Sequence, residues 1–190
     1  MSGTPFRAVA IGASAGAIQA LSVILPTLPA DYPLPILIVV HVPADRSNIL
    51  APLFQAKCRL VVREAEDKEP ALAGNIYFAP ADYHLLVEND GSLSLANDEP
   101  VQHSRPSIDV LFESAADAFG AALIGIILSG ANADGALGLK AVADAGGTTL
   151  VEEPATAYAD TMPIEALKAC PSARALTLAG IAQFLMEATA

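Results

Sequence analysis

Short apolar runs recur along this chain, and they limit the folds it can adopt more than any other feature. Three of them contain no polar side chain: 8–11 (A-V-A-I), 35–40 (P-I-L-I-V-V) and 123–128 (L-I-G-I-I-L). Runs of this length are typical of strands that are buried on both faces, as in a parallel sheet covered by helices on either side. The chain is therefore expected to place a sheet at the centre of its fold.

Helical patterns alternate with these runs. Ile18, Leu21, Ile24 and Leu25 are spaced three or four residues apart, and the pattern stops at Pro26. Further helices are predicted over 49–54, 108–119, 137–145, 164–169 and 181–188, and further short strands over 60–62, 76–78 and 148–151.

One antiparallel element is also predicted. The segments 84–88 and 92–95 flank Asn89-Asp90-Gly91, a sequence typical of a hairpin turn. Strands that otherwise alternate with helices indicate an α/β fold, with a mainly parallel sheet wrapped by helices on both faces.

Composition and charge exclude several classes of protein. Of the 190 residues, 53% are apolar and 16% are charged, which is too apolar and too weakly charged for a disordered chain. Two cysteines are too few for a disulfide-stabilised scaffold of this length. With 10 basic and 21 acidic residues the net charge is −11, so no nucleic-acid partner is expected. Length and the lack of a linker predict one domain over residues 1–190.

Metal, cofactor and membrane classes are not favoured either. The three histidines form no cluster and the cysteines have no C-x-x-C spacing, so neither a metal nor another cofactor is expected. Segment 8–30 carries no charge, which raises the question of a membrane span or signal peptide. Its glycines, Gln19 and Pro26 argue against both. We expect a cytoplasmic protein without membrane insertion.

The first predicted strand ends in residues 12–16 (G-A-S-A-G), and a helix follows. A dinucleotide-binding turn would have glycine in place of Ser14, and a phosphate-binding loop would have lysine in place of Ala17. The pattern fits G-x-S-x-G, a sharp turn that exposes a serine hydroxyl. A plain tight turn remains the alternative.

Two polar residues follow strands that should lie beside the first one. His41 comes directly after 35–40, and Asp134 lies in the turn after 123–128. Carboxyl ends of parallel strands meet at one edge of the sheet, where such folds bind ligands. A neutral imidazole could take the proton of Ser14, and Asp134 could orient that imidazole. The alternatives are a capping or core role for His41 and an N-cap role for Asp134 on the helix that follows it.

Other candidates for these roles fit less well. The order Ser…His…Asp along the chain differs from the order in α/β-hydrolases, which disfavours that superfamily. Asp109 lies inside a predicted helix, and Asp82 follows a proline after a short strand. His84 and His103 have no predicted catalytic role.

Motifs along nearly the whole chain resemble, in the same order, the catalytic domain of CheB-type chemotaxis methylesterases. They are I-G-A-S-A-G (11–16), V-H-V-P (40–43), G-N-I-Y-F-A-P (74–80), H-L (84–85), R-P-S-I-D-V-L-F (105–112), L-S-G-A-N-A-D-G (128–135) and M-P (162–163). The resemblance implies a doubly wound, predominantly parallel sheet of about seven strands with one antiparallel hairpin. It also implies a protein-glutamate methylesterase, able in that family to deamidate glutamine, that acts on the cytoplasmic helices of methylated chemoreceptors.

The resemblance also implies roles for particular residues. The family's catalytic triad maps onto Ser14, His41 and Asp134, and its proposed oxyanion donors map onto the backbone amides of His41 and Ala131. The surroundings differ from the family's usual pattern. Thr-Gly-Gly after the nucleophile is replaced by A-G-A (15–17), Gly-Met-Gly-Asn-Asp-Gly by G-A-N-A-D-G (130–135), and Gly-Met-Pro by T-M-P (161–163). Alanines 15, 17, 131 and 133 thus alter the neighbourhood of the triad and leave its substrate and rate open.

Two rival functions remain from the sequence: a serine hydrolase acting on a different ester or amide, and a non-catalytic interaction module with the same fold. Only residues 1–7 precede the first predicted strand, so we expect no receiver domain in this chain. Regulation would then come from a separate receiver or methyltransferase protein.

Overall fold

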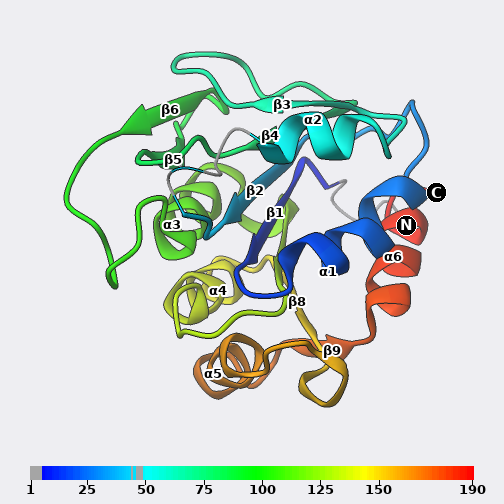
Figure 1. The fold of residues 1–190 in the computed structure, drawn as a ribbon, viewed down its shortest axis with the longest axis vertical. Coiled ribbons are helices and arrows are strands. Elements are labelled where there is room, and N and C mark those ends of the chain that lie inside the picture. The colour runs from blue at the N-terminus through cyan, green and yellow to red at the C-terminus, as the bar shows by residue number, and fades with distance from the viewer. Residues whose placement is uncertain (1–5, 44, 46–48) are drawn as a thin grey trace.

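The computed structural model describes residues 6–43, 45 and 49–190, and within them a parallel sheet forms the centre of the molecule. Its strands are β1 (Ala8–Ala13), β2 (Ile36–Val40), β3 (Val61–Glu64), β4 (Asn75–Phe78), β7 (Leu123–Ile127), β8 (Thr148–Glu152) and β9 (Arg174–Leu176). They lie in the order β3-β4-β2-β1-β7-β8-β9, and every neighbouring pair is parallel (Figure 1).

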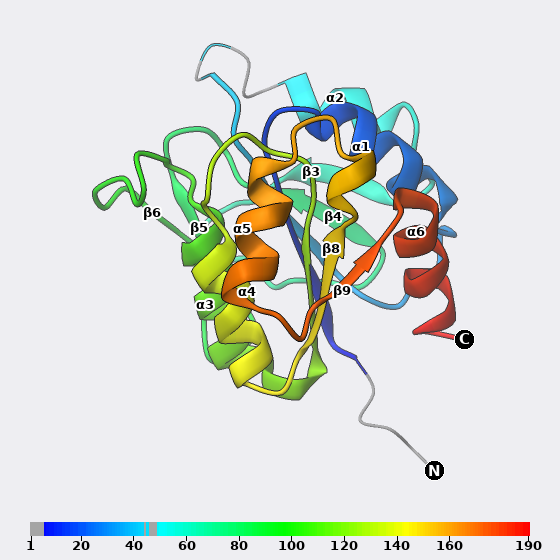
Figure 2. The same ribbon diagram turned by 90° about the horizontal axis from the view of Figure 1, so that it is seen from below.

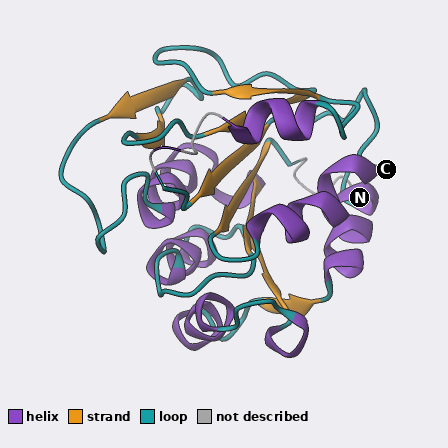
Figure 3. Ribbon diagram, viewed as in Figure 1, coloured by secondary structure: helices purple, strands orange, loops and turns teal. Residues whose placement is uncertain are grey.

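Helices cover both faces of this sheet, as the apolar runs predict. The helices are α1 (Ala17–Ile24), α2 (Leu50–Gln55), α3 (Ile108–Phe119), α4 (Ala136–Asp144), α5 (Thr161–Ala169) and α6 (Leu178–Glu187), with 3₁₀ turns over Leu25–Thr27, Gly120–Ala122 and Pro154–Thr156. One layer contains α1, α2 and α6, and the other contains α3, α4 and α5 (Figures 1 and 2). Figure 3 separates the strands from the two helical layers by colour.

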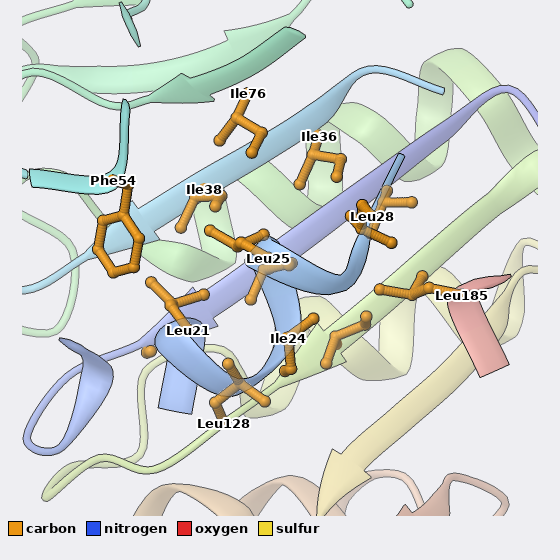
Figure 4. Packing of buried hydrophobic residues seen from close by; sticks show 14 of the residues in the cluster. Leu21, Ile24, Leu25, Leu28, Ile36, Ile38, Phe54, Ile76, Leu128 and Leu185 are labelled. Carbon is orange, nitrogen blue, oxygen red and sulfur yellow. The ribbon is translucent and has the colours of Figure 1, made fainter. Parts of the chain in front are cut away.

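Side chains along each central strand alternate between two cores. Val9 and Ile11 of β1 pack toward the α1 layer, while Ala8 and Ala10 pack toward the α3 layer. Figure 4 shows the first core, where side chains of α1 lie against those of β2 and β4. Because both faces are covered, every residue of β1 and β2 is buried. This burial accounts for the unbroken apolar runs in the sequence.

The predicted hairpin forms a sheet of its own. Strands β5 (His84–Val87) and β6 (Leu93–Ala96) pair antiparallel with each other and are not part of the seven-stranded sheet. Leu85, Val87 and Leu93 pack into the core beneath α3.

Three details differ from the sequence prediction. β9 was not predicted, because its residues are Arg-Ala-Leu and two of them are exposed, so no apolar run marks it. α5 begins at Thr161, with Pro163 in its first turn, where the missing N–H costs no helical hydrogen bond. α6 begins at Leu178, because the Thr177 hydroxyl caps an amide of its first turn.

The chain runs from β1 outward to β2 and later returns to the other side of β1 to form β7. Strand order therefore reverses between β1 and β7. In α/β sheets this reversal opens a crevice at the carboxyl ends of the strands, where ligands bind. Residues that follow β1, β2 and β7 meet there.

At this edge a buried carboxylate joins α3 to α4. Asp109, in the first turn of α3, is 3% exposed. Its Oδ1 accepts hydrogen bonds from the backbone N–H groups of Gly135 (3.0 Å) and Gly138 (2.7 Å), and Oδ2 accepts one from Gln102 (3.2 Å). Amides at a helix start have no partner inside the helix. Asp109 of α3 therefore caps the start of α4.

This carboxylate should give the stability of the fold a characteristic pH dependence. Burial raises the pKa of Asp109 to about 6, although hydrogen bonds from Gly138 and Gly135 lower it. The unfolded chain loses this proton near the ordinary aspartate pKa of about 3.9. From about pH 4 to about pH 6 the folded protein binds more protons than the unfolded chain, so the free energy of unfolding falls as pH rises.

We expect Asp109→Asn to abolish that decrease in the free energy of unfolding, which amounts to about 2–3 kcal/mol. The fold should survive the change. The side-chain amide of Gln102 can flip, so that its oxygen accepts a hydrogen bond from the NH₂ group of the new asparagine. Urea denaturation at closely spaced pH values from 4 to 7 measures the effect. The control is Asp117→Asn, an exposed carboxylate further along the same helix. Equal pH dependence in wild type and Asp109→Asn would contradict the prediction.

Candidate active site

The structure brings the three predicted residues to one edge of the sheet. Ser14 follows β1, His41 follows β2, and Asp134 lies between β7 and α4. β1 is hydrogen-bonded to both β2 and β7, so the three strand ends are neighbours. Ser14 is half-buried, the His41 side chain is 13% exposed, and the Asp134 side chain is fully buried.

Ser14 lies in a tight turn between β1 and α1. Its N–H donates to the carbonyl of Ser129 (2.9 Å), and its carbonyl accepts from the N–H of Ala17 (3.0 Å). Gly16 has φ +85°, and a Cβ there would lie 2.7 Å from the Cβ of Tyr158, so both backbone conformation and space require glycine. Within the described part of the chain, the Ser14 hydroxyl forms no hydrogen bond. No described residue therefore restrains this hydroxyl.

Ser129 holds the serine turn in place. Its hydroxyl donates to the carbonyl of Ala15 (2.7 Å) and accepts from the N–H of Ala159 (2.8 Å). Its own N–H donates to Oε2 of Glu152 (2.8 Å), whose pKa is raised by burial. The sequence analysis did not single out Ser129. The feature that could have identified Ser129 is its position as a polar residue directly after the most apolar strand, at the ligand-binding edge of the sheet.

Asp134 is the most densely hydrogen-bonded group of the site. Oδ2 accepts from His41 Nε2 (2.7 Å) and from the N–H of Ile108 (2.7 Å). Oδ1 accepts from the hydroxyl of Ser107 (2.9 Å) and from the N–H of Asp109 (3.0 Å). Two of these donors are amides at the start of α3. Asp134 therefore caps α3 while it holds His41.

The alternative that Asp134 caps the helix that follows it is wrong. The N-cap position of α4 is Gly135, with φ +97°, and the carboxylate of Asp134 points to α3 instead. Ser107 occupies the N-cap position of α3, but its hydroxyl binds Asp134 and no amide of its own helix. The capping of α3 is supplied from a distant segment.

Asp134 is ionised at neutral pH. Burial by itself would raise the pKa of Asp134, but the hydrogen bonds from His41, Ile108 and Asp109 outweigh it and hold the pKa below the ordinary value. The positive end of the α3 dipole acts in the same direction. An ionised carboxylate can only accept, so the proton of the neutral imidazole lies on Nε2 of His41. The Nδ1 lone pair is then the basic site.

Asn132 is a further partner of the imidazole that the sequence analysis missed. Its side-chain Nδ2 lies 3.2 Å from Nδ1 of His41, and its Oδ1 accepts the N–H of Asp134 (3.0 Å). Nothing in the sequence singled out Asn132, because it lies in a turn of small residues. Asparagine is common in turns, where its side chain forms hydrogen bonds with the nearby backbone.

One of the two predicted oxyanion donors is not available. The backbone N–H of His41 donates to the carbonyl of Ala13 (3.1 Å), because the β1–β2 pairing extends to this residue. Among the described residues, the backbone N–H groups of Ala131 and Ala15 meet no acceptor. Ala131 therefore remains a candidate donor, and Ala15, which follows the serine, becomes one.

A cavity of about 310 Å³ opens beside His41. It is lined by His41, Val42, Pro43, His103, Ser104, Arg105 and Pro106. Gln102 and His103 form the tip of the turn that walls it, with φ +49° and +62°. Arg105 is held by Asp82, its Nη2 lying 2.7 Å from the carboxylate. His41 thus faces a pocket that contains a fixed cation.

His84 supports this wall and does not face the cavity. It is buried, its Nδ1 accepts the N–H of Ser107 (3.2 Å), and its Nε2 donates to the carbonyl of Glu99 (3.0 Å). Its role is to hold the segment that leads into α3.

Within the described residues, no three histidine, cysteine or acidic side chains are arranged to hold a metal ion. None of the helices in the described part of the chain has the length and apolar character needed to cross a membrane.

Comparison with known proteins identifies relatives over nearly the whole chain. The family model described as CheB methylesterase matches residues 9–185. A Leptospira interrogans protein (serovar copenhageni) is 43% identical over 182 residues, which are 96% of this chain and 94% of that protein. A Bordetella parapertussis protein named protein-glutamate methylesterase/protein-glutamine glutaminase is 39% identical over 184 residues, 95% of this chain. The match covers 52% of the Bordetella protein, so this chain spans about half its length.

The fold agrees with a solved relative. The crystal structure of the Thermotoga maritima CheB methylesterase catalytic domain matches with a TM-score of 0.91 at 31% identity, over 97% of this chain and 99% of that one. The predicted doubly wound α/β fold with its hairpin is confirmed by this likeness and by the strand order. The chain belongs to the CheB methylesterase family.

Proposed function

We propose that this chain is a serine hydrolase that removes γ-methyl esters from glutamyl residues of chemoreceptors and deamidates their glutamines. The observation that carries the proposal is the position of Ser14, in a tight turn at the same sheet edge as the hydrogen-bonded pair His41–Asp134. The activity named for the Bordetella relative is of the same kind.

The chemistry follows from the geometry. Ser14 Oγ attacks the ester carbonyl, and Nδ1 of His41 takes the hydroxyl proton. Asp134 stabilises the imidazolium that forms, and the amides of Ala131 and Ala15 stabilise the oxyanion. His41 then protonates the departing methanol, and water, activated by the same imidazole, releases glutamate. With a glutamine substrate, ammonia departs in place of methanol.

The serine and the imidazole are not hydrogen-bonded to each other in this structure. We expect substrate binding to bring them within reach, because catalytic hydrogen bonds are often long or absent before the substrate is bound.

The substrate side of the proposal is a glutamyl methyl ester on the cytoplasmic helices of a chemoreceptor. We propose that residues 1–190 form the catalytic domain for this reaction, acting in the cytoplasm. A separate receiver or methyltransferase protein is the proposed regulatory partner.

The rival functions differ in measurable ways. A non-catalytic module would not react with a fluorophosphonate probe, whereas any serine hydrolase with this site would become labelled at Ser14. Methanol release from methylated receptor separates the methylesterase from a hydrolase of other esters.

We expect Ser14→Ala to abolish both fluorophosphonate labelling and methanol release while leaving the fold intact. The hydroxyl has no intramolecular partner among the described residues, so its loss removes the nucleophile without removing a contact. Circular dichroism checks the fold, and Ser172→Ala, an exposed serine near β9, is the matched control. Turnover within about tenfold of wild type would refute the assignment of the nucleophile.

We expect Asp134→Asn to lower kcat by about 10⁴, the size of loss known for the corresponding change in a serine-protease triad. An amide at this position favours the wrong imidazole tautomer and cannot stabilise the imidazolium. Stopped-flow or steady-state methanol release measures the loss. Asp144→Asn, at an exposed carboxylate in α4, should have no effect. A loss below about tenfold would indicate that Asp134 serves only to cap α3.

A further inference from the structure

His41 is held at both ring nitrogens, and only one of its partners belongs to the triad. Nε2 lies 2.7 Å from Oδ2 of Asp134, and Nδ1 lies 3.2 Å from Nδ2 of Asn132. Oδ1 of Asn132 accepts the backbone N–H of Asp134 at 3.0 Å. The three residues therefore form a closed ring of hydrogen bonds.

The direction of each bond in this ring is determined by what the groups can donate. The backbone N–H of Asp134 can only donate, so it must meet the oxygen of the Asn132 amide, and the NH₂ group faces His41. That NH₂ group can only donate, so Nδ1 must offer its lone pair. The ionised Asp134 carboxylate can only accept, so Nε2 carries the proton. One tautomer of the neutral imidazole satisfies all three bonds.

We propose that Asn132 is a positioning residue, which donates to Nδ1 and thereby holds His41 as the neutral tautomer that acts as base toward Ser14. The inference rests on the function proposed above. A proton on Nδ1 would set two donors face to face, so Asn132 releases the ring when His41 takes the serine proton. In the free protein the same contact favours the neutral imidazole over the protonated one.

Other charged groups also face the imidazole. Asp134 contacts Nε2 and favours the protonated form, and Arg105 and His103 line the cavity on the other side of the ring. These groups are unchanged when Asn132 is replaced. A difference between Asn132 variants therefore reports the contact at Nδ1.

Asn132→Asp isolates the donor from the rest of the side chain. Aspartate has the same shape and keeps the oxygen that accepts the N–H of Asp134, but it presents a second oxygen to Nδ1. A carboxylate beside Nδ1 favours the protonated ring by its charge, whereas Asn132→Ala removes the donor and adds no charge. A purely structural role in the turn would leave the titration of the ring unchanged in Asn132→Ala, so the two variants together separate the donor role from a structural one.

The measurement is a pH titration of the ring nitrogens by NMR in the full chain labelled with ¹⁵N-histidine. His41→Gln assigns the signal among the three histidines. We expect the midpoint for residue 41 to rise by about half to one pH unit in Asn132→Ala, which loses one hydrogen bond. In Asn132→Asp the rise should exceed about one pH unit.

The control is Asn89→Asp, which makes the same change of charge in the exposed turn between β5 and β6 and should leave the midpoint unchanged. An Asn132→Ala midpoint within about 0.2 pH unit of wild type, or below it, would overturn the proposal, as would an Asn132→Asp midpoint that does not rise. Asn132→Ser, which also removes the amide donor without adding charge, replaces Asn132→Ala if that variant folds poorly. The titration needs no substrate, so its outcome is independent of methanol release. Shifted midpoints in a chain without esterase activity would reject the proposed function but support the contact of Asn132 with His41.

Discussion

The buried carboxylate of Asp134 is the group on which the rest of the site depends. A charge removed from water is costly unless hydrogen bonds replace its hydration, and here four donors do so. The donors come from the end of β2, through His41, and from the start of α3. One carboxylate therefore fixes the imidazole, the entry into α3 and the turn after β7 relative to one another.

The two helices beside the site cap each other. Asp134 precedes α4 and binds the first amides of α3, while Asp109 in α3 binds the first amides of α4. The pKa values of the two carboxylates are shifted in opposite directions from the ordinary aspartate value. Burial raises the pKa of Asp109, whereas the hydrogen bonds from the imidazole and the α3 amides outweigh burial and lower the pKa of Asp134. The negative charge of Asp134 also raises the pKa of Asp109, so the two carboxylates are coupled to each other.

The sequence was sufficient to predict what parallel-sheet geometry dictates. Unbroken apolar runs located β1, β2 and β7, and polar residues at their ends predicted where Ser14, His41 and Asp134 would meet. It was not sufficient for partners that only tertiary contact supplies. Ser129 bonds to a carbonyl 114 positions away, and Asn132 bonds to an imidazole 91 positions away. β9 carries no apolar run. The resemblance assigned an oxyanion role to the backbone N–H of His41, but this N–H donates to the carbonyl of Ala13 in the β1–β2 pairing.

The arrangement at Nδ1 suggests why the site can be rigid before substrate arrives. Asp134 and Asn132 hold both nitrogens of His41, so the proposed reaction requires no reorientation of the imidazole. The serine hydroxyl is also a donor. When Ser14 approaches Nδ1 it replaces one donor with another, so the lone pair never loses a hydrogen bond and the exchange costs little. In the proposed mechanism, the imidazole therefore exchanges a single hydrogen bond, from Asn132 to Ser14, before proton transfer begins.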